Sequence, residues 1–284
     1  SEFNYPALIG KRSLMKEPST AVSLFKLATE KFNNGNYSEA EDAFKKSLLI
    51  DKTWYAYQGL GGSLFNQNKF AEAIDAFRAS LALQEDWNSY HFLGGALINQ
   101  NKVTEAIDAF SKAVTLKEEP TSYYFLGQAL LQNKRSAEAI DALKRSTELE
   151  QNWNSFQALG GALFNQMKFQ KAIDAFQKSI SLQTSQESYR GLIMSLIYSQ
   201  QYERGLKVFD DMLNDYCELK NDSGLHMSFI QLGIFHDINR NSRSDCLKTV
   251  RDLHKYFAES VLTHSVDEIY KAGSNYFFAG TTVT

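Results

Sequence analysis

The sequence repeats itself every 33 residues, and this period restricts the fold more than any other feature. An alanine recurs at this step, and a bulky apolar residue follows each alanine four positions later. The alanines are Ala40, Ala73, Ala106, Ala139 and Ala172, and the bulky residues are Phe44, Phe77, Phe110, Leu143 and Phe176. In a sixth copy Gly205 and Phe209 take these places. Copies in constant register predict an array of stacked units, each of which buries its apolar face on its neighbours.

Each copy is expected to form two amphipathic helices. Apolar residues recur at i, i+3, i+4 and i+7, which is the helical period. A polar break, such as the one at Asn66–Lys69, divides each copy in two. Twelve residues before each alanine, a small residue follows a leucine, as in Leu93-Gly94, and a small residue there lets two helix axes come close. Pro120 stands at an expected first helical turn, where its missing N–H costs nothing.

Composition and charge exclude several other classes. The chain is 43% hydrophobic and 22% charged, as in folded soluble proteins, and its net charge of −3 gives no electrostatic footprint for nucleic acid. No apolar run reaches the roughly 18 residues of a membrane span. Cys217 and Cys246 make no disulfide framework, so a reducing, cytoplasmic compartment is expected. We expect no cofactor, no metal site and no catalysis, since no residues have the spacing of a metal, phosphate-loop or triad motif.

The spacing of Leu93-Gly94, Ala106 and Phe110, shared by all copies, resembles the tetratricopeptide repeat family. The repeat is one residue shorter than the family's usual 34, and Gln84–Asp86 replaces the family's proline near the end of the second helix. The resemblance implies an all-α, right-handed superhelical solenoid of six helical hairpins with a helical C-terminal cap. The expected hairpins are residues 21–53, 54–86, 87–119, 120–152, 153–185 and 186–216.

The two ends of the chain differ from the repeats. Residues 1–20 are expected to be a tail with a cloning scar, because Ser1–Phe3 lacks an initiator Met and a common cloning site encodes Glu-Phe. Residues 217–284 hold two more amphipathic stretches, which are expected to cap the last repeat. Residues 274–284 look more like a strand. A natural tail or the start of a following α/β domain would explain this ending.

The family resemblance implies a binding scaffold whose first helices line a concave groove for a peptide or a helix. We therefore expect a non-catalytic protein–protein interaction module. The alternative is a substrate-recognition or positioning region of a larger, transferase-type enzyme, and a third reading is self-association through a repeat face. The carboxylate clamp of the chaperone-binding members is not expected, because its positions hold Phe25, Thr29, Gly59, Asn88 and Phe92.

A column of carboxamides on the first helices is the main candidate binding feature. Its members are Asn33, Asn66, Asn99, Gln132 and Asn165, and Tyr198 takes the same place in the sixth copy. A carboxamide both donates and accepts hydrogen bonds, so a ladder of them can bind the backbone of an extended peptide. The same residues lie near helix C-termini and could instead cap them. Both readings stay open from the sequence.

Glycines and aromatic residues complete the candidate groove. A second glycine follows the packing glycine at Gly62, Gly95 and Gly161, where glycine costs roughly 1 kcal/mol against alanine. We interpret it as a shallow floor that another backbone can approach, with crowding against the adjacent helix as the alternative. Aromatic side chains at first-helix positions that commonly point inward are Tyr55, His91, Phe92, Tyr124 and Phe125.

Overall fold

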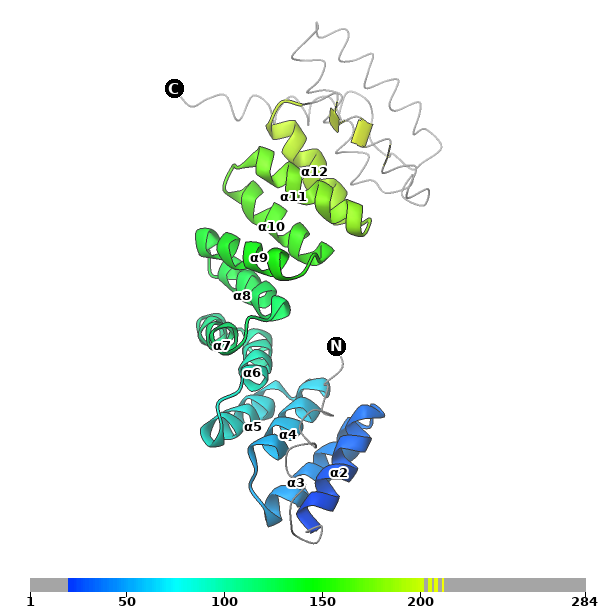
Figure 1. Ribbon diagram of the computed structural model, residues 1–284, viewed down its shortest axis with the longest axis vertical. Coiled ribbons are helices and arrows are strands. Elements are labelled where there is room, and N and C mark those ends of the chain that lie inside the picture. Colours follow the sequence, from blue (N-terminus) through cyan, green and yellow to red (C-terminus); the bar gives the residue numbers. More distant parts are fainter. Residues whose placement is uncertain (1–19, 202–203, 206, 209–210, 212–284) are drawn as a thin grey trace, which may run out of the picture. The chain divides into compact units, whose positions relative to one another are not determined.

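A computed structural model describes residues 20–201 together with residues 204, 205, 207, 208 and 211. From Thr20 to Tyr198 it consists of α-helices joined by short turns, with no strand in this range (Figure 1). The expected tail at the start of the chain and the expected cap after the repeats lie outside the described residues. The helices are α2 (Thr20–Asn33), α3 (Tyr37–Ile50), α4 (Trp54–Asn66), α5 (Phe70–Leu83), α6 (Trp87–Asn99), α7 (Val103–Leu116), α8 (Pro120–Gln132), α9 (Ser136–Leu149), α10 (Trp153–Asn165), α11 (Phe169–Leu182) and α12 (Gln186–Tyr198).

The helices pair into hairpins, which confirms the all-α hairpin fold predicted from the period. The chain divides after Glu150 into two compact units. In the first unit the hairpins are α2/α3, α4/α5, α6/α7 and α8/α9, and in the second unit α10 pairs with α11 and is followed by α12. Each second helix also packs on the first helix of the next hairpin within its unit, as α3 does on α4 and α11 on α12.

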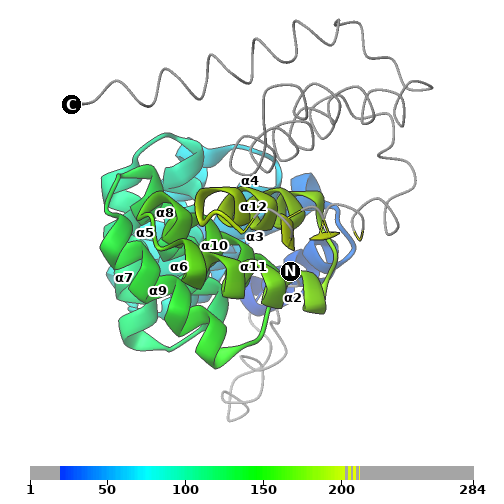
Figure 2. The ribbon, with the colours of Figure 1, turned by 90° about the horizontal axis from the view of Figure 1, so that it is seen from above.

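In the first unit the first helices form a row on one side. α2 contacts α4, α4 contacts α6, and α6 contacts α8, whereas each second helix packs chiefly on first helices. Figure 2 looks along this row, with α7 at the outer edge and α6 inside it. Because the first helices approach each other more closely than the second helices do, their side is the concave side of the first unit.

The predicted polar break in each copy is a turn of constant geometry. After α4, Asn68 donates its backbone N–H to the Phe65 carbonyl at 2.9 Å, and Lys69 donates to the Leu64 carbonyl at 2.9 Å. These two bonds define a Schellman motif, in which the residue after the helix takes a left-handed conformation. The same position has positive φ in every copy, at Gly35, Asn68, Asn101, Lys134, Met167 and Gln200. Only the first of the six is a glycine.

The repeated small and large residues form the core, as the sequence predicts. The five repeated alanines are fully buried, and so is the ring of Phe77. A Cβ added to Gly94 would lie 2.8 Å from the Phe110 ring, closer than atoms can pack. Gly61 and Gly160 make the same close approach to the rings of their own hairpins. The first glycine of each pair is therefore a packing glycine, which confirms that prediction.

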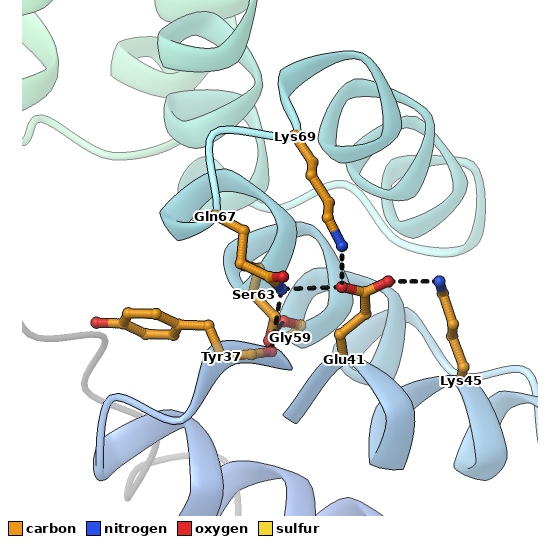
Figure 3. A network of polar contacts seen from close by, with 7 residues as sticks. All are labelled: Tyr37, Glu41, Lys45, Gly59, Ser63, Gln67 and Lys69. Atoms are coloured by element: carbon orange, nitrogen blue, oxygen red, sulfur yellow. Dashed lines mark hydrogen bonds and ion pairs between the residues drawn. The ribbon is translucent and has the colours of Figure 1, made fainter. Parts of the chain in front are cut away.

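The first two hairpins are also joined by a charged network that breaks the repeat pattern (Figure 3). Glu41 on α3 is 5% exposed, at a position where the next four copies have isoleucine. Its carboxylate accepts hydrogen bonds from Lys45 on its own helix and from Gln67 and Lys69 of the second hairpin. Burial alone raises the pKa of Glu41, but these hydrogen bonds outweigh burial and lower the pKa to about 2.

Candidate functional site

The concave side of the first unit carries one stripe of residues from each first helix. Positions spaced by four, three and four residues lie on one face of a helix. The stripes lie next to each other, since the ring of Phe65 on α4 meets the ring of Phe92 on α6 edge to face at 5.9 Å. We call these residues the first-helix face: Tyr55, Gly59, Gly62 and Asn66 on α4; Asn88, Phe92, Gly95 and Asn99 on α6; Thr121, Phe125, Gln128 and Gln132 on α8.

The carboxamides of this face are exposed at the ends of their helices. Asn66 donates Nδ2 to the Gly62 carbonyl at 2.9 Å, and Asn99 donates Nδ2 to the Gly95 carbonyl at 2.9 Å. The last helical carbonyls already accept backbone N–H groups of the following turn. The side chains are therefore not needed to close the helices, and each keeps its carbonyl oxygen and a second N–H for other partners. Gln132 is exposed at the same position of α8.

The second glycines differ from the packing glycines in their surroundings. A Cβ added to Gly95 would reach the Phe65 ring at 3.4 Å, which is ordinary van der Waals contact. Within the second unit, a Cβ added to Gly161 would meet no heavy atom within 4 Å. Gly62 is buried, and its carbonyl accepts the Asn66 amide. Crowding therefore does not require glycine at position 95, and a shallow floor stays the interpretation that fits there.

The aromatic residues of the face are held by rings beneath them. Phe92 stacks on Phe77 with ring centroids 6.1 Å apart, and Phe125 stacks on Phe110 at 5.9 Å. Phe92 is half-buried, whereas Phe125 is 41% exposed. Because each ring rests on a buried ring of the preceding hairpin, packing restricts its orientation. An exposed ring restricted in this way is a suitable contact for an apolar anchor, since little side-chain entropy is lost on binding.

The other predicted aromatic residues lie deeper. Tyr55 is half-buried against Phe25, with ring centroids 4.8 Å apart. His91 is half-buried and its Nδ1 lies 2.9 Å from Ser122 Oγ on α8. Burial lowers the pKa of His91 to about 4, so its ring is neutral near pH 7. His91 thus joins two hairpins and brings no charge to the face.

Three further polar residues on the same stripes had not been predicted as binding residues. Thr121 and Gln128 are exposed on α8, and Asn88 is half-buried on α6. Gln128 donates Nε2 to the Tyr124 hydroxyl at 3.0 Å, which orients both side chains. The spacing of four, three and four residues around the amide column is the sequence signal that identifies them.

The predicted residues do not all fall in one unit. Asn165 and Gly161 lie on α10 of the second unit, where Asn165 is exposed. Within the first unit, Asn66, Asn99 and Gln132 therefore form a row over the three successive first helices α4, α6 and α8. Among the described residues, no group of three or more His, Cys, Asp or Glu side chains could hold a metal ion. None of the described helices is long and apolar enough to cross a membrane.

Sequence comparison identifies the repeats. The family profile described as tetratricopeptide repeat matches the overlapping residues 25–90, 59–119 and 93–155. A comparison with curated proteins gives no match.

Solved structures with the same arrangement of helices are numerous. The C-terminal part of a TPR repeat-containing protein from Cytophaga hutchinsonii is 16% identical, with a TM-score of 0.67, over 81% of this chain and 94% of that one. The Pseudomonas aeruginosa pilF protein is 18% identical, with a TM-score of 0.58, over 69% and 91%. YrrB, described as a TPR protein with an unusual peptide-binding site, is 20% identical, with a TM-score of 0.54, over 64% and 92%. At these identities the likeness concerns the fold.

Proposed function

Because residues 25–155 belong to the tetratricopeptide repeat family, we propose that this chain is a non-catalytic scaffold that binds an extended segment of a partner protein on its first-helix face. The observation that carries the proposal is the row of exposed amides at Asn66, Asn99 and Gln132, one on each of the three hairpins that follow the first. Two of them keep hydrogen-bonding groups that their own helix does not use, as the hydrogen bonds to Gly62 and Gly95 imply.

The spacing of this row suits an extended backbone. Helices that pack in contact lie about 8–10 Å apart, and an extended chain advances about 3.3 Å for each residue. An amide on each successive first helix would therefore meet roughly every third residue of a bound segment. The side chains between these points could rest on the rings of Phe92 and Phe125, which are held by stacking.

A structural relative supports the same kind of ligand. YrrB is described as having a peptide-binding site, and its fold matches this chain. The alternative expected from the sequence, a positioning region of a larger transferase-type enzyme, would use the same face to hold the substrate protein. Both readings place binding on this face, so one set of variants tests the site for either.

The test compares two triple variants, in each of which alanine replaces three carboxamide side chains. Asn66→Ala, Asn99→Ala and Gln132→Ala remove the amide row, while Gln84→Ala, Gln177→Ala and Gln183→Ala remove exposed amides away from the first helices. A partner captured from lysate and identified by mass spectrometry would be titrated calorimetrically against both, after circular dichroism shows equal folding. We expect the first variant to weaken binding at least about tenfold, as the loss of a few hydrogen bonds implies, and the control to leave it unchanged. Equal affinities for both variants would place binding elsewhere.

A further inference from the structure

We propose that the segment bound on the first-helix face is itself uncharged: a stretch of a partner protein with apolar or aromatic anchors and no Asp, Glu, Lys or Arg where it crosses α4, α6 and α8. This inference rests on the function proposed above, because it concerns the chemistry of the ligand of the same face.

The three first helices that carry the face contain no charged residue. Between Trp54 and Asn66, Trp87 and Asn99, and Pro120 and Gln132 there is no Asp, Glu, Lys or Arg. The one titratable imidazole, that of His91, has a pKa lowered to about 4 by burial. The second helices of the same hairpins contrast with this, since their charged residues are Glu72, Asp75, Arg78, Glu105, Asp108, Lys112, Glu138, Asp141, Lys144, Arg145 and Glu148. In these three hairpins charge is thus absent from the first helix and concentrated on the second, whereas α2, the first helix of the first hairpin, carries Lys26, Glu30 and Lys31.

Besides the charges of α2, other charged residues near the face lie in the turns, and several of these are paired with residues of this chain. Lys69 pairs with Glu41 at 2.8 Å, and Lys117 pairs with Glu119 at 2.8 Å. Asp86 caps α6, accepting the backbone N–H groups of that helix's first turn. A further pair joins Arg135 and Glu138 at 2.6 Å, and Lys102 and Lys134 are exposed in turns that follow the helix ends.

This distribution selects a ligand by excluding charged ones. A charged side chain laid on α4, α6 or α8 would lose part of its water and find no opposite charge on these three helices, which opposes its binding. The amides can bind a neutral backbone, and the rings of Phe92 and Phe125 can bind apolar side chains. A surface that penalises charge therefore distinguishes neutral segments from acidic and basic ones without any base or acid of its own.

A second copy of this chain is a poorer occupant than a partner segment. The first-helix side is concave in the first unit, and two concave surfaces cannot close on each other without leaving a void. The second helices of another copy would present the charged residues of α5, α7 and α9 to an uncharged face. An extended neutral segment meets neither obstacle.

A library of random short peptides displayed on phage is the probe, selected against the whole chain. We expect the enriched peptides to contain fewer Asp, Glu, Lys and Arg residues than the library and more aromatic ones. Their affinity should change by less than about twofold between low and high salt, because screening acts only on charges. Enrichment of acidic or basic peptides, or of none, would overturn the proposal.

Two lysine variants separate this inference from the function beneath it. Gln128→Lys places a cation on the face, and Thr104→Lys places one on α7, where the residue is also exposed. The first should shift selection toward acidic, salt-sensitive peptides, while the second should select the same neutral peptides as the parent chain. Charged peptides that the amide triple variant no longer binds would overturn the ligand class but keep the scaffold function. Peptides that bind the triple variant equally well would overturn the site itself.

Discussion

Lys69, the residue that precedes α5, donates a hydrogen bond of 2.8 Å to Glu41 Oε2 on α3 and so ties the second hairpin to the first. Glu41 stands where Ile74, Ile107 and Ile140 stand in the following copies. The carboxylate is tolerated at a buried position because Lys45, Lys69 and Gln67 surround it with donors (Figure 3). The side chains of Lys45 and Lys69 are partly exposed, so solvent screens part of their attraction to the Glu41 carboxylate.

Acid is expected to weaken this junction. The pKa of Glu41 is lowered from 4.5 to about 2 in the folded chain, because hydrogen bonds from its donors outweigh the burial that would raise it. Its contribution of about 2 kcal/mol is therefore complete above pH 4.5 and is lost as the pH falls toward 2. Glu41→Gln should lose most of it at pH 7, and Glu41→Ile should remove the pH dependence with little loss, since a buried pair often equals an apolar residue. Urea unfolding at pH 7 and pH 3, with exposed Glu72→Gln as control, measures this. An unchanged midpoint for Glu41→Gln would refute it.

A second pH effect is expected at higher pH from His91. Burial lowers its pKa from 6.5 to about 4, so the neutral ring contributes stability that is complete above pH 6.5 and is lost as the pH falls toward 4. We expect the chain to lose about 2 kcal/mol from this residue between pH 7 and pH 5. His91→Tyr, which copies Tyr124 of the next hairpin, should lack this loss. The comparison is made by urea unfolding at both pH values, and by the imidazole proton titration in NMR. A His91 pKa near 6.5 would contradict the prediction.

Adjacent glycines on α6 should respond in opposite ways to alanine. Gly94→Ala places a Cβ 2.8 Å from the Phe110 ring and is expected to cost about 1–3 kcal/mol. Gly95→Ala meets nothing closer than 3.4 Å, so the better helix propensity of alanine should stabilise the helix by up to about 1 kcal/mol. Thermal unfolding of the two variants provides the measurement. If position 95 is a floor for a bound backbone, Gly95→Ala should also weaken ligand binding while it stabilises the fold.

The turn residues offer a gain in stability. Met167 is 78% exposed and has a φ of 54°, a left-handed conformation that costs a residue with a Cβ about 1 kcal/mol. Met167→Gly is expected to recover roughly that amount, because the exposed side chain has little packing to lose. Met167→Ala serves as the control and should show no gain. Equal urea midpoints for the glycine and alanine variants would mean that the turn carries no strain.

The period by itself determined much of the fold. The 33-residue step, the Leu-Gly pair and the buried alanines predict the helices, their breaks at residues such as Asn66–Lys69 and the packing glycines. These features are local or recur in every copy, so a single sequence contains several instances of each. The amide column was visible for the same reason, although the period cannot distinguish a copied cap from a copied ligand contact. The handedness of the superhelix, the compartment and the capping helices stay predictions.

Only the tertiary structure decided what depends on residues of a neighbouring hairpin. Glu41 is tolerated in the core because Lys69 and Gln67 of the next hairpin donate hydrogen bonds to its carboxylate. The residues around Glu41 in the sequence do not predict these contacts. Gly59 is glycine because a Cβ there would lie 2.4 Å from the ring of Phe44, in the preceding hairpin. Similarly, the ring of Phe125 stacks on the ring of Phe110 from the preceding hairpin while it stays 41% exposed. Such contacts join positions far apart along the chain, and packing fixes them only when the hairpins have met.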